Sequence, residues 1–156
     1  MTDSAYHAKL WLLRLSDMSK KVEAERRTLE MLEAKLYRGV SSYDGIHYRI
    51  DPTQAQANHE DNLLSFSFQL QRVEQAQNKY LHELEITQNV MEELPDMLAA
   101  LLTDRYINGI KWQKLLDVYH YEKTQLFEYN QKALEQLAEV LKRKQIHIDT
   151  EELVTA

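Results

Sequence analysis

The sequence predicts an all-α protein in which a long antiparallel helical hairpin, a coiled coil, precedes a small C-terminal domain of shorter helices. The chain has only three glycines and two prolines, which permits long uninterrupted helices. Two long stretches carry apolar residues at alternating steps of four and three, the period of a coiled-coil seam. The last third carries shorter stretches with helical periodicity, separated by residues that favour turns.

The first long helix is expected from Ser4 to Tyr37, with Ser4 as its cap. Its seam has one polar position, Glu25. The apolar seam residues are Trp11, Leu15, Met18, Val22, Leu29, Leu32 and Leu36. The cluster Leu10-Trp11-Leu12-Leu13 is apolar on more than one side, so we expect it to meet the C-terminal domain or a second protomer.

A loop is expected over residues 38–53, because turn-forming residues are concentrated there. They are Gly39, Ser41, Ser42, Asp44-Gly45 and Asp51-Pro52. The alternation of Ile46, Tyr48 and Ile50 is compatible with a short extended piece. Two interpretations remain open: a packed connector without a function of its own, and a tyrosine-rich loop that binds a partner.

The second long helix is expected from Gln54 to Leu94 and folds back on the first, which makes residues 1–94 the hairpin. Its seam has polar residues at Gln77 and Thr87, which we expect to fix the register. The other seam residues are Leu63, Phe66, Leu70, Val73, Tyr80, Leu84, Met91 and Leu94. A two-helix hairpin buries one face of each helix, so we expect it to dimerise or to bind the C-terminal domain.

Pro95 ends the second helix, and Asp96 is expected to cap the next one, which runs to Tyr106. Asn108-Gly109 follows as a pair that accepts positive φ. The next helix carries Trp112, Leu115, Leu116 and Tyr119 at helical spacing. After an interruption at His120-Tyr121, the last helix buries Leu126, either Tyr129 or Asn130, Ala133, Leu134 and Leu137. Two helices joined by about four residues in a compact helical unit form the helix-turn-helix pattern.

This segment resembles region 4 of bacterial sigma factors and, more closely, the sigma-like C-terminal half of the RinA/ArpU group of phage late-transcription regulators. The matching residues are Tyr106, Gly109, Trp112, Tyr121, Gln125, Ala133 and Leu134. The resemblance implies a sigma region 4-like helix-turn-helix over residues 95–144, followed by a tail over 145–156. It also implies a transcription regulator, expected to be an activator, in the cytoplasm of a bacterial host.

The chain departs from the family pattern at several positions. Leu116 stands where the family has alanine, and Glu122 stands where a serine or threonine caps the second helix. Basic family residues along the reading face are replaced here by Thr124, Phe127 and Glu128.

The resemblance assigns DNA binding to the second helix of the motif and to nearby lysines, with double-stranded DNA and RNA polymerase as partners. The candidate DNA-binding residues are Lys111, Lys114, Lys123, Thr124, Gln125, Phe127, Glu128, Gln131 and Lys132. Gln125 suits adenine, Phe127 a thymine methyl group and Glu128 cytosine. The four lysines would lie near phosphates.

The net charge is −6, and no segment has the basic excess of a protein that holds DNA mainly through phosphates. The alternative function is therefore a protein-interaction module with a degenerate helix-turn-helix that binds a host or phage protein. A third interpretation is a helical hairpin that only oligomerises.

Other classes of function have little support in the sequence. No cysteine is present, and no two of the six histidines lie three or four residues apart, so we expect no metal site. No nucleotide-binding or nucleophile motif occurs, so we expect neither an enzyme nor a cofactor. We also expect no membrane segment and no secretory signal.

Overall fold

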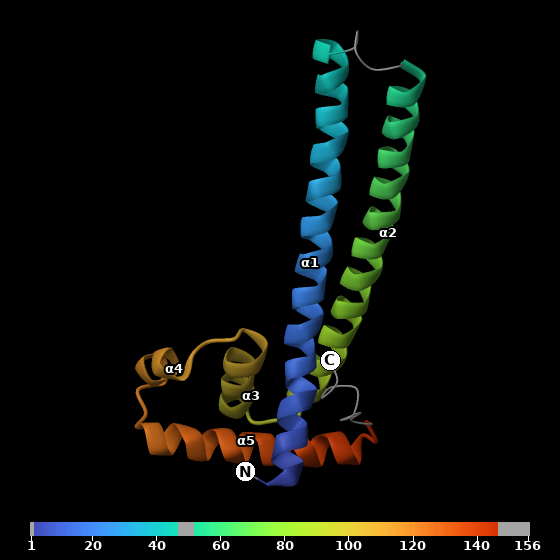
Figure 1. Ribbon diagram of the computed structural model, residues 1–156. Coiled ribbons are helices and arrows are strands. Elements are labelled where there is room, and N and C mark those ends of the chain that lie inside the picture. The colour runs from blue at the N-terminus through green and yellow to red at the C-terminus, as the bar shows by residue number, and fades with distance from the viewer. Residues whose placement is uncertain (1, 47–51, 147–156) are drawn as a thin grey trace. The chain divides into compact units, whose positions relative to one another are not determined.

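The structure, a computed structural model, describes residues 2–46 and 52–146, and every regular element in those ranges is a helix. The all-α class predicted from the sequence is therefore confirmed. The chain divides into two compact units. One unit combines residues up to Met18 with those from Leu81 onward, and the other comprises Ser19–Tyr80. Figure 1 shows the two long helices that contribute to both units.

Helix α1 spans Asp3–Ile46 and helix α2 spans Pro52–Met91. The prediction that the first helix ends at Tyr37 is wrong, because α1 continues through much of the expected loop. Glycine and serine inside a helix each cost about 1 kcal/mol or less, and no proline interrupts the chain before Pro52. Helix propagation therefore overrides these turn signals. The rest of the expected extended piece, Tyr48 and Ile50, lies outside the described residues.

The ends of the long helices also differ from the sequence-based expectation. Ser4 lies inside α1, and the backbone N–H of Ala5 donates to Thr2 Oγ1 at 3.3 Å instead. Helix α2 begins at Pro52, whose fixed φ suits a first helical position. It ends at Met91, before Leu94, since a helix usually stops ahead of a proline.

In the unit Ser19–Tyr80, α1 and α2 contact each other through a mixed apolar and polar seam. Val22 and Val73 are buried, as predicted. Gln69 is buried as well, and its Nε2 donates to the backbone oxygen of Glu25 at 2.9 Å and to the Glu25 carboxylate. The seam placement of Leu63 and Leu70 is wrong, because both are exposed. Gln69 is buried in place of its neighbour Leu70, and it gives the polar Glu25 a partner.

In the residues that the structure describes, the other unit contains four shorter helical elements after α2. They are α3 (Asp96–Leu102), the π-helix η1 (Thr103–Ile107), α4 (Trp112–Tyr119) and α5 (Lys123–Arg143). Asp96 does not cap α3; Pro95 occupies the cap position, and Asp96 lies in the first turn. There its charge complements the helix dipole without a side-chain hydrogen bond.

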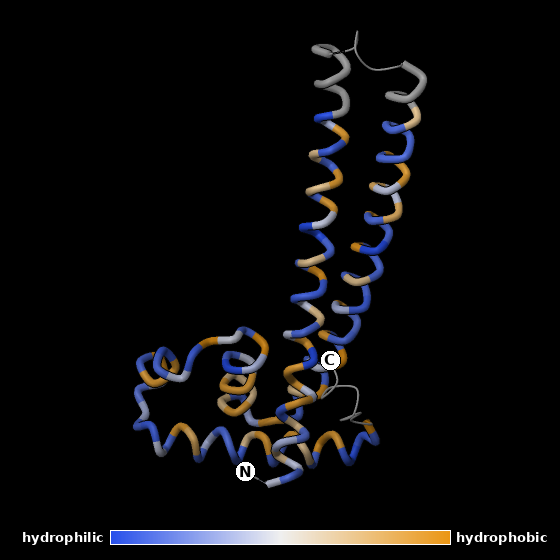
Figure 2. The backbone as a smooth tube through the Cα atoms, viewed as in Figure 1, coloured by the Kyte–Doolittle hydropathy of each residue, from blue (hydrophilic) through white to orange (hydrophobic). Residues whose placement is uncertain are grey.

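In the core of this unit, the N-terminal end of α1 and the C-terminal end of α2 pack against α5. Trp11 and Leu12 of α1 pack in one cluster with Leu134 and Leu137 of α5. The remaining buried members are Ala5, Ala8, Val90, Met91, Leu94, Leu98, Leu102, Tyr106, Ala133, Val140 and Leu141. The apolar cluster at residues 10–13 therefore meets the C-terminal helices of its own chain. Figure 2 shows apolar positions recurring along α5.

A polar network stabilises the contact between α1 and α2 in the same unit. Arg14 Nη2 donates to the Glu83 carboxylate at 3.0 Å and to Thr87 Oγ1 at 2.9 Å. Its guanidinium also lies over the Trp11 ring, 4.1 Å from the ring centroid. Burial lowers the pKa of Arg14, and the carboxylate of Glu83 opposes that effect. The buried polar residue Thr87 is thus satisfied by a partner across the helix pair.

Candidate nucleic-acid interface

The turn between α4 and α5 is formed by His120, Tyr121 and Glu122. His120 ends α4 in the left-handed region, with φ 58°, and its N–H donates to the Leu116 oxygen at 3.0 Å. Glu122 is extended and begins α5, without a capping bond from its side chain. The turn ends α4 and begins α5 within three residues. It lies where the sequence predicts an interruption of the helix.

An apolar cluster of its own holds α4 against α5. Leu101, Leu115 and Leu126 have no exposed surface. Partly buried residues surround them, namely Ile110, Trp112, Leu116, Tyr119, Tyr121 and Tyr129. Because each of α3, α4 and α5 supplies one of the three buried leucines, the first turns of α5 are fixed by packing.

Three consecutive side chains of the π-helix η1, those of residues 104–106, form hydrogen bonds with three different segments of this unit. The Tyr119 hydroxyl of α4 donates to Asp104 Oδ2 at 2.7 Å. Arg105 Nη1 donates to the Ile110 backbone oxygen at 3.0 Å, and the Tyr106 hydroxyl donates to Asn130 Oδ1 of α5 at 3.1 Å. Sequence reasoning did not identify these contacts, because nothing in the helical periodicity signals a π-helix.

The Asp104–Tyr119 contact changes the acidity of the phenol. Partial burial, the hydrogen bond to Asp104 and the negative charge of its carboxylate together raise the pKa of Tyr119 to about 12. Burial likewise raises the pKa of Tyr106, although the bond to Asn130 and the charge of Arg105 oppose it. Both tyrosines are therefore neutral hydrogen-bond donors at physiological pH.

Helix α5 has a buried side and an exposed side along its first half. The buried side carries Leu126, Asn130, Ala133, Leu134 and Leu137. These are the residues predicted from the apolar stripe, and the alternative left open there is resolved, since Asn130 is buried and Tyr129 only partly. The strong helix formers of this segment and the basic residues Lys142 and Arg143 in its last turn favour the helix.

The candidate residues of α5 lie on the exposed side. Lys123, Thr124, Gln125, Phe127, Glu128 and Lys132 are exposed, and Gln131 is half-buried. Lys111 and Lys114 are also exposed, just before and within α4. They do not line the same depression as the α5 residues.

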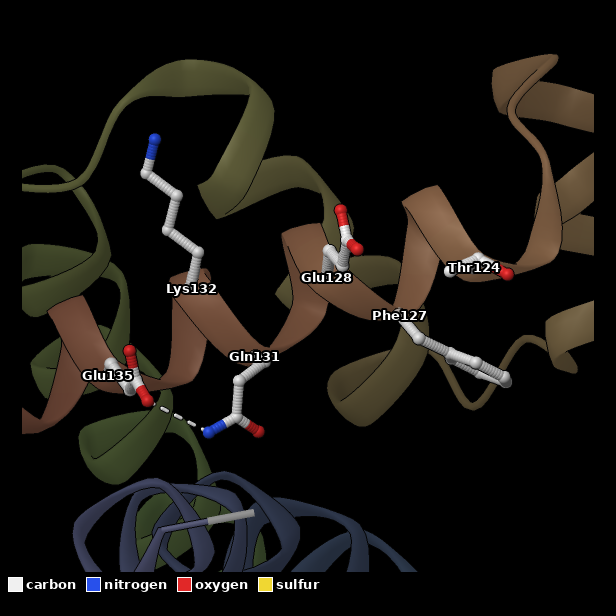
Figure 3. Close-up of a pocket in the computed structure, with 6 residues that line it drawn as sticks. All are labelled: Thr124, Phe127, Glu128, Gln131, Lys132 and Glu135. Carbon is white, nitrogen blue, oxygen red and sulfur yellow. Dashed lines mark hydrogen bonds between the residues drawn. The ribbon is translucent and has the colours of Figure 1, made fainter.

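Five of the candidates border one shallow depression on α5, shown in Figure 3. They are Thr124, Phe127, Glu128, Gln131 and Lys132. Glu135 completes this border, although sequence reasoning did not select it, and its carboxylate accepts a hydrogen bond from Gln131 Nε2 at 2.9 Å. Its helical spacing from Gln131 and Glu128 is the signal that would have identified it. In Figure 3, Glu128 and Lys132 extend from one side of the helix and Phe127 and Gln131 from the other.

An aromatic pair connects the start of α5 to α4. The rings of Trp112 and Phe127 meet edge to face, with centroids 5.0 Å apart. Lys123 Nζ lies 5.8 Å from the Phe127 ring, and the Arg105 guanidinium lies 4.9 Å from the Trp112 ring. Phe127 nevertheless keeps 40% of its surface exposed. Its position is thus fixed on one edge, while the rest of the ring is available for an apolar contact.

The charge on this side of α5 is balanced. Lys123 and Lys132 are matched by Glu128 and Glu135 within residues 123–135. A surface of this kind offers hydrogen-bonding groups and one aromatic ring, with little net attraction for phosphates. Its chemistry suits a partner recognised by shape and hydrogen bonding more than by bulk charge.

In the part of the chain that the structure describes, no three His, Cys, Asp or Glu side chains gather where a metal ion would bind. None of the described helices combines the length and apolar character needed to cross a membrane. Comparisons with protein-family models, with curated proteins and with solved structures found no match for this chain.

Proposed function

We propose that this protein is a sigma-like transcription regulator of the phage type, which binds promoter DNA through a helix-turn-helix made by α4 and α5. The exposed polar side of α5, directly after the left-handed turn at His120, is the observation that carries the proposal. In helix-turn-helix proteins the N-terminal residues of the second helix contact base edges in the major groove. Here the three-leucine cluster fixes the backbone of those residues, so little backbone entropy is lost when they bind.

The reading contacts follow from the chemistry of the exposed residues. Gln125 presents an amide that can pair with adenine through two hydrogen bonds, and the free side of the Phe127 ring suits a thymine methyl group. Glu128 accepts from the amino group of cytosine. Lys111, Lys114, Lys123 and Lys132 contact phosphates and set the orientation of the helix.

The balanced charge of α5 implies that this protein binds DNA weakly by itself. We therefore include RNA polymerase as a partner that holds the regulator at its promoter, in the cytoplasm of a bacterial host. The long helices serve as an antiparallel coiled-coil support, consistent with the Arg14–Glu83 and Glu25–Gln69 contacts between α1 and α2. The protein binds promoter DNA and RNA polymerase, and it has no catalytic role or cofactor.

The test is selection of bound sequences from a random duplex DNA library at low salt, followed by binding titrations of the selected duplex at increasing salt. We expect one enriched motif and a slope of log affinity against log salt of about −3 to −4, since four lysines contact phosphates and each contributes about −0.9. Failure to enrich any motif, together with no binding at low salt, would reject the proposal.

A protein-interaction module is the second candidate, and a specific observation favours it. The exposed Phe127, whose ring meets Trp112 edge to face, lies beside two glutamates on α5 where a DNA-binding surface usually has basic residues. Apolar anchors of this kind commonly serve protein interfaces. If DNA selection fails while purified RNA polymerase binds the protein, and Phe127→Ala abolishes that binding, the second candidate replaces the first.

A further inference from the structure

The outer surface of α2 in the unit Ser19–Tyr80 exposes an unusual amount of apolar surface. Leu63 is 49% exposed, Leu64 55%, Phe68 57% and Leu70 39%. These four residues, the α2 patch, lie within about two helical turns. Clusters of large exposed apolar side chains mark interaction sites more often than isolated ones do.

Two residues of the α2 patch, Leu64 and Phe68, lie away from the contact between α2 and α1, whereas Leu63 and Leu70 border it. Gln69 and Val73 are the buried residues of this part of α2, and Gln69 hydrogen-bonds to Glu25 of α1. At 100° per residue, Leu64 lies half a turn around the helix from Val73, and Phe68 lies well outside the buried side. This part of α2 therefore carries a second apolar side, formed by Leu64 and Phe68, in addition to the side that contacts α1, and such a side needs a partner of its own to be buried.

The chemistry of the α2 patch indicates what covers it. Residues 62–71 include no charged side chain, although 28% of the chain is charged and its net charge is −6. A partner attracted by charge would have nothing to bind on this surface. Two copies of the same acidic chain repel each other, and a charge-free apolar surface is where they can meet at the lowest electrostatic cost.

Leu64 and Phe68 also belong to a second heptad-like stripe that the contact with α1 does not use. The stripe has alternating steps of four and three and consists of Ala57, Asp61, Leu64, Phe68, Gln71 and Gln75. All of these residues are exposed. Such spacing keeps one side of a helix facing a second helix over several turns.

We infer that α2 pairs with α2 of a second copy of this chain, antiparallel, around a two-fold axis between Leu64 and Phe68. In this arrangement Leu64 of each copy packs on Phe68 of the other, and Asp61 of each copy approaches Arg72 of the other. A parallel pair would instead place the two Asp61 carboxylates against each other within the stripe. The inference concerns self-association alone and does not depend on DNA binding.

Sedimentation equilibrium of the full chain over a range of concentrations tests the self-association. We expect a reversible dimer, and we expect the variant Leu64→Glu/Phe68→Glu to weaken dimerisation by roughly tenfold or more, as expected when interface anchors are lost. The control is Met31→Glu, the same kind of substitution at a single residue of α1 that is 65% exposed. Circular dichroism checks that each variant stays helical. A wild-type chain that is monomeric throughout, or a double variant that dimerises like wild type, would overturn the inference.

Disulfide cross-linking tests the antiparallel orientation of the two α2 helices. The sequence contains no cysteine, so any disulfide must form between the introduced residues. The antiparallel stripe places residue 57 of one copy opposite residue 75 of the other. Oxidation of a mixture of Ala57→Cys and Gln75→Cys chains should therefore yield the mixed disulfide dimer, while each variant alone should yield little. Efficient cross-linking of either variant alone, without the mixed product, would show a parallel pair and contradict the proposed arrangement.

Discussion

The Tyr119 hydroxyl donates a hydrogen bond of 2.7 Å to Asp104 Oδ2, which ties the end of α4 to the π-helix η1. The next two residues of η1 make equivalent connections. Arg105 bonds to the Ile110 oxygen before α4, and Tyr106 bonds to Asn130 of α5. One short irregular segment thus positions both helices of the candidate interface, and its contacts yield direct predictions.

Alkaline pH should reveal the Asp104–Tyr119 contact. The pKa of Tyr119 is raised from 10.0 to about 12 in the folded protein, so the folded state holds this proton more tightly than the unfolded state does. The resulting stabilisation is fully present below pH 10 and is lost as the pH rises toward 12. Urea unfolding at a series of pH values should show a steeper loss of stability for wild type than for Tyr119→Phe. Equal pH dependence in the two proteins would contradict the assignment.

The buried Tyr106–Asn130 bond should contribute measurably to stability. Tyr106→Phe leaves the amide of Asn130 without this partner in a buried site, which should cost about 1–3 kcal/mol of unfolding free energy. Tyr6→Phe, at a residue that is 47% exposed, is the matched control and should change stability by less than about 0.5 kcal/mol. In the double variant Tyr106→Phe/Asn130→Leu the cost should be smaller than the sum of the two single costs. Strict additivity in chemical denaturation would argue against the bond.

The packing of α5 on α1 should depend strongly on single leucines. Leu137 is fully buried in the cluster that contains Trp11. Leu137→Ala should cost about 2–5 kcal/mol, because it removes packed methyl groups and leaves a cavity. Leu81→Ala, at a residue that is 52% exposed, should change stability by less than about 0.5 kcal/mol. Denaturation followed by tryptophan fluorescence measures both, and similar values for the two variants would disprove the packing.

Two variants of α5 should distinguish residues that recognise bases from residues that bind phosphates. Gln125→Ala should weaken binding to the selected duplex by roughly 1–3 kcal/mol and relax the preference at one base position. Lys132→Gln should weaken binding to all duplexes about equally and reduce the salt slope by about one. Fluorescence anisotropy with the selected duplex and with single-base variants distinguishes them. A Gln125→Ala protein that discriminates bases as well as wild type would remove this residue from the reading role.

Local features of the chain were predicted well where a single residue decides the backbone. Gly109 has φ 69°, and His120 ends α4 in the left-handed region, at the two breaks expected from the sequence. The buried side of α5 also matches the predicted stripe from Leu126 to Leu137. These features depend on conformational preference and on periodicity within one helix, both of which can be read along the chain.

Features that depend on two segments were predicted less well. The turn residues after Tyr37 predict a helix end there, whereas α1 continues to Ile46. The four-three spacing predicts Leu70 in the seam, but Gln69 is the residue buried against Glu25. A step of one residue on a helix turns the side chain by about 100°, so the partner helix decides which of two neighbours is buried. Polar residues with a partner can then displace apolar ones.

By itself the sequence determined the all-helical class, the breaks around α4 and the two sides of α5, because glycine, proline and apolar spacing act over a few residues. Only the tertiary structure decided that Trp11 and Leu12 pack against α5, and that Asp104, Arg105 and Tyr106 secure α4 and α5 from a π-helix. These contacts join residues far apart in the chain. Their free energy depends on distances and burial in the folded state, which no pattern within a single helix encodes.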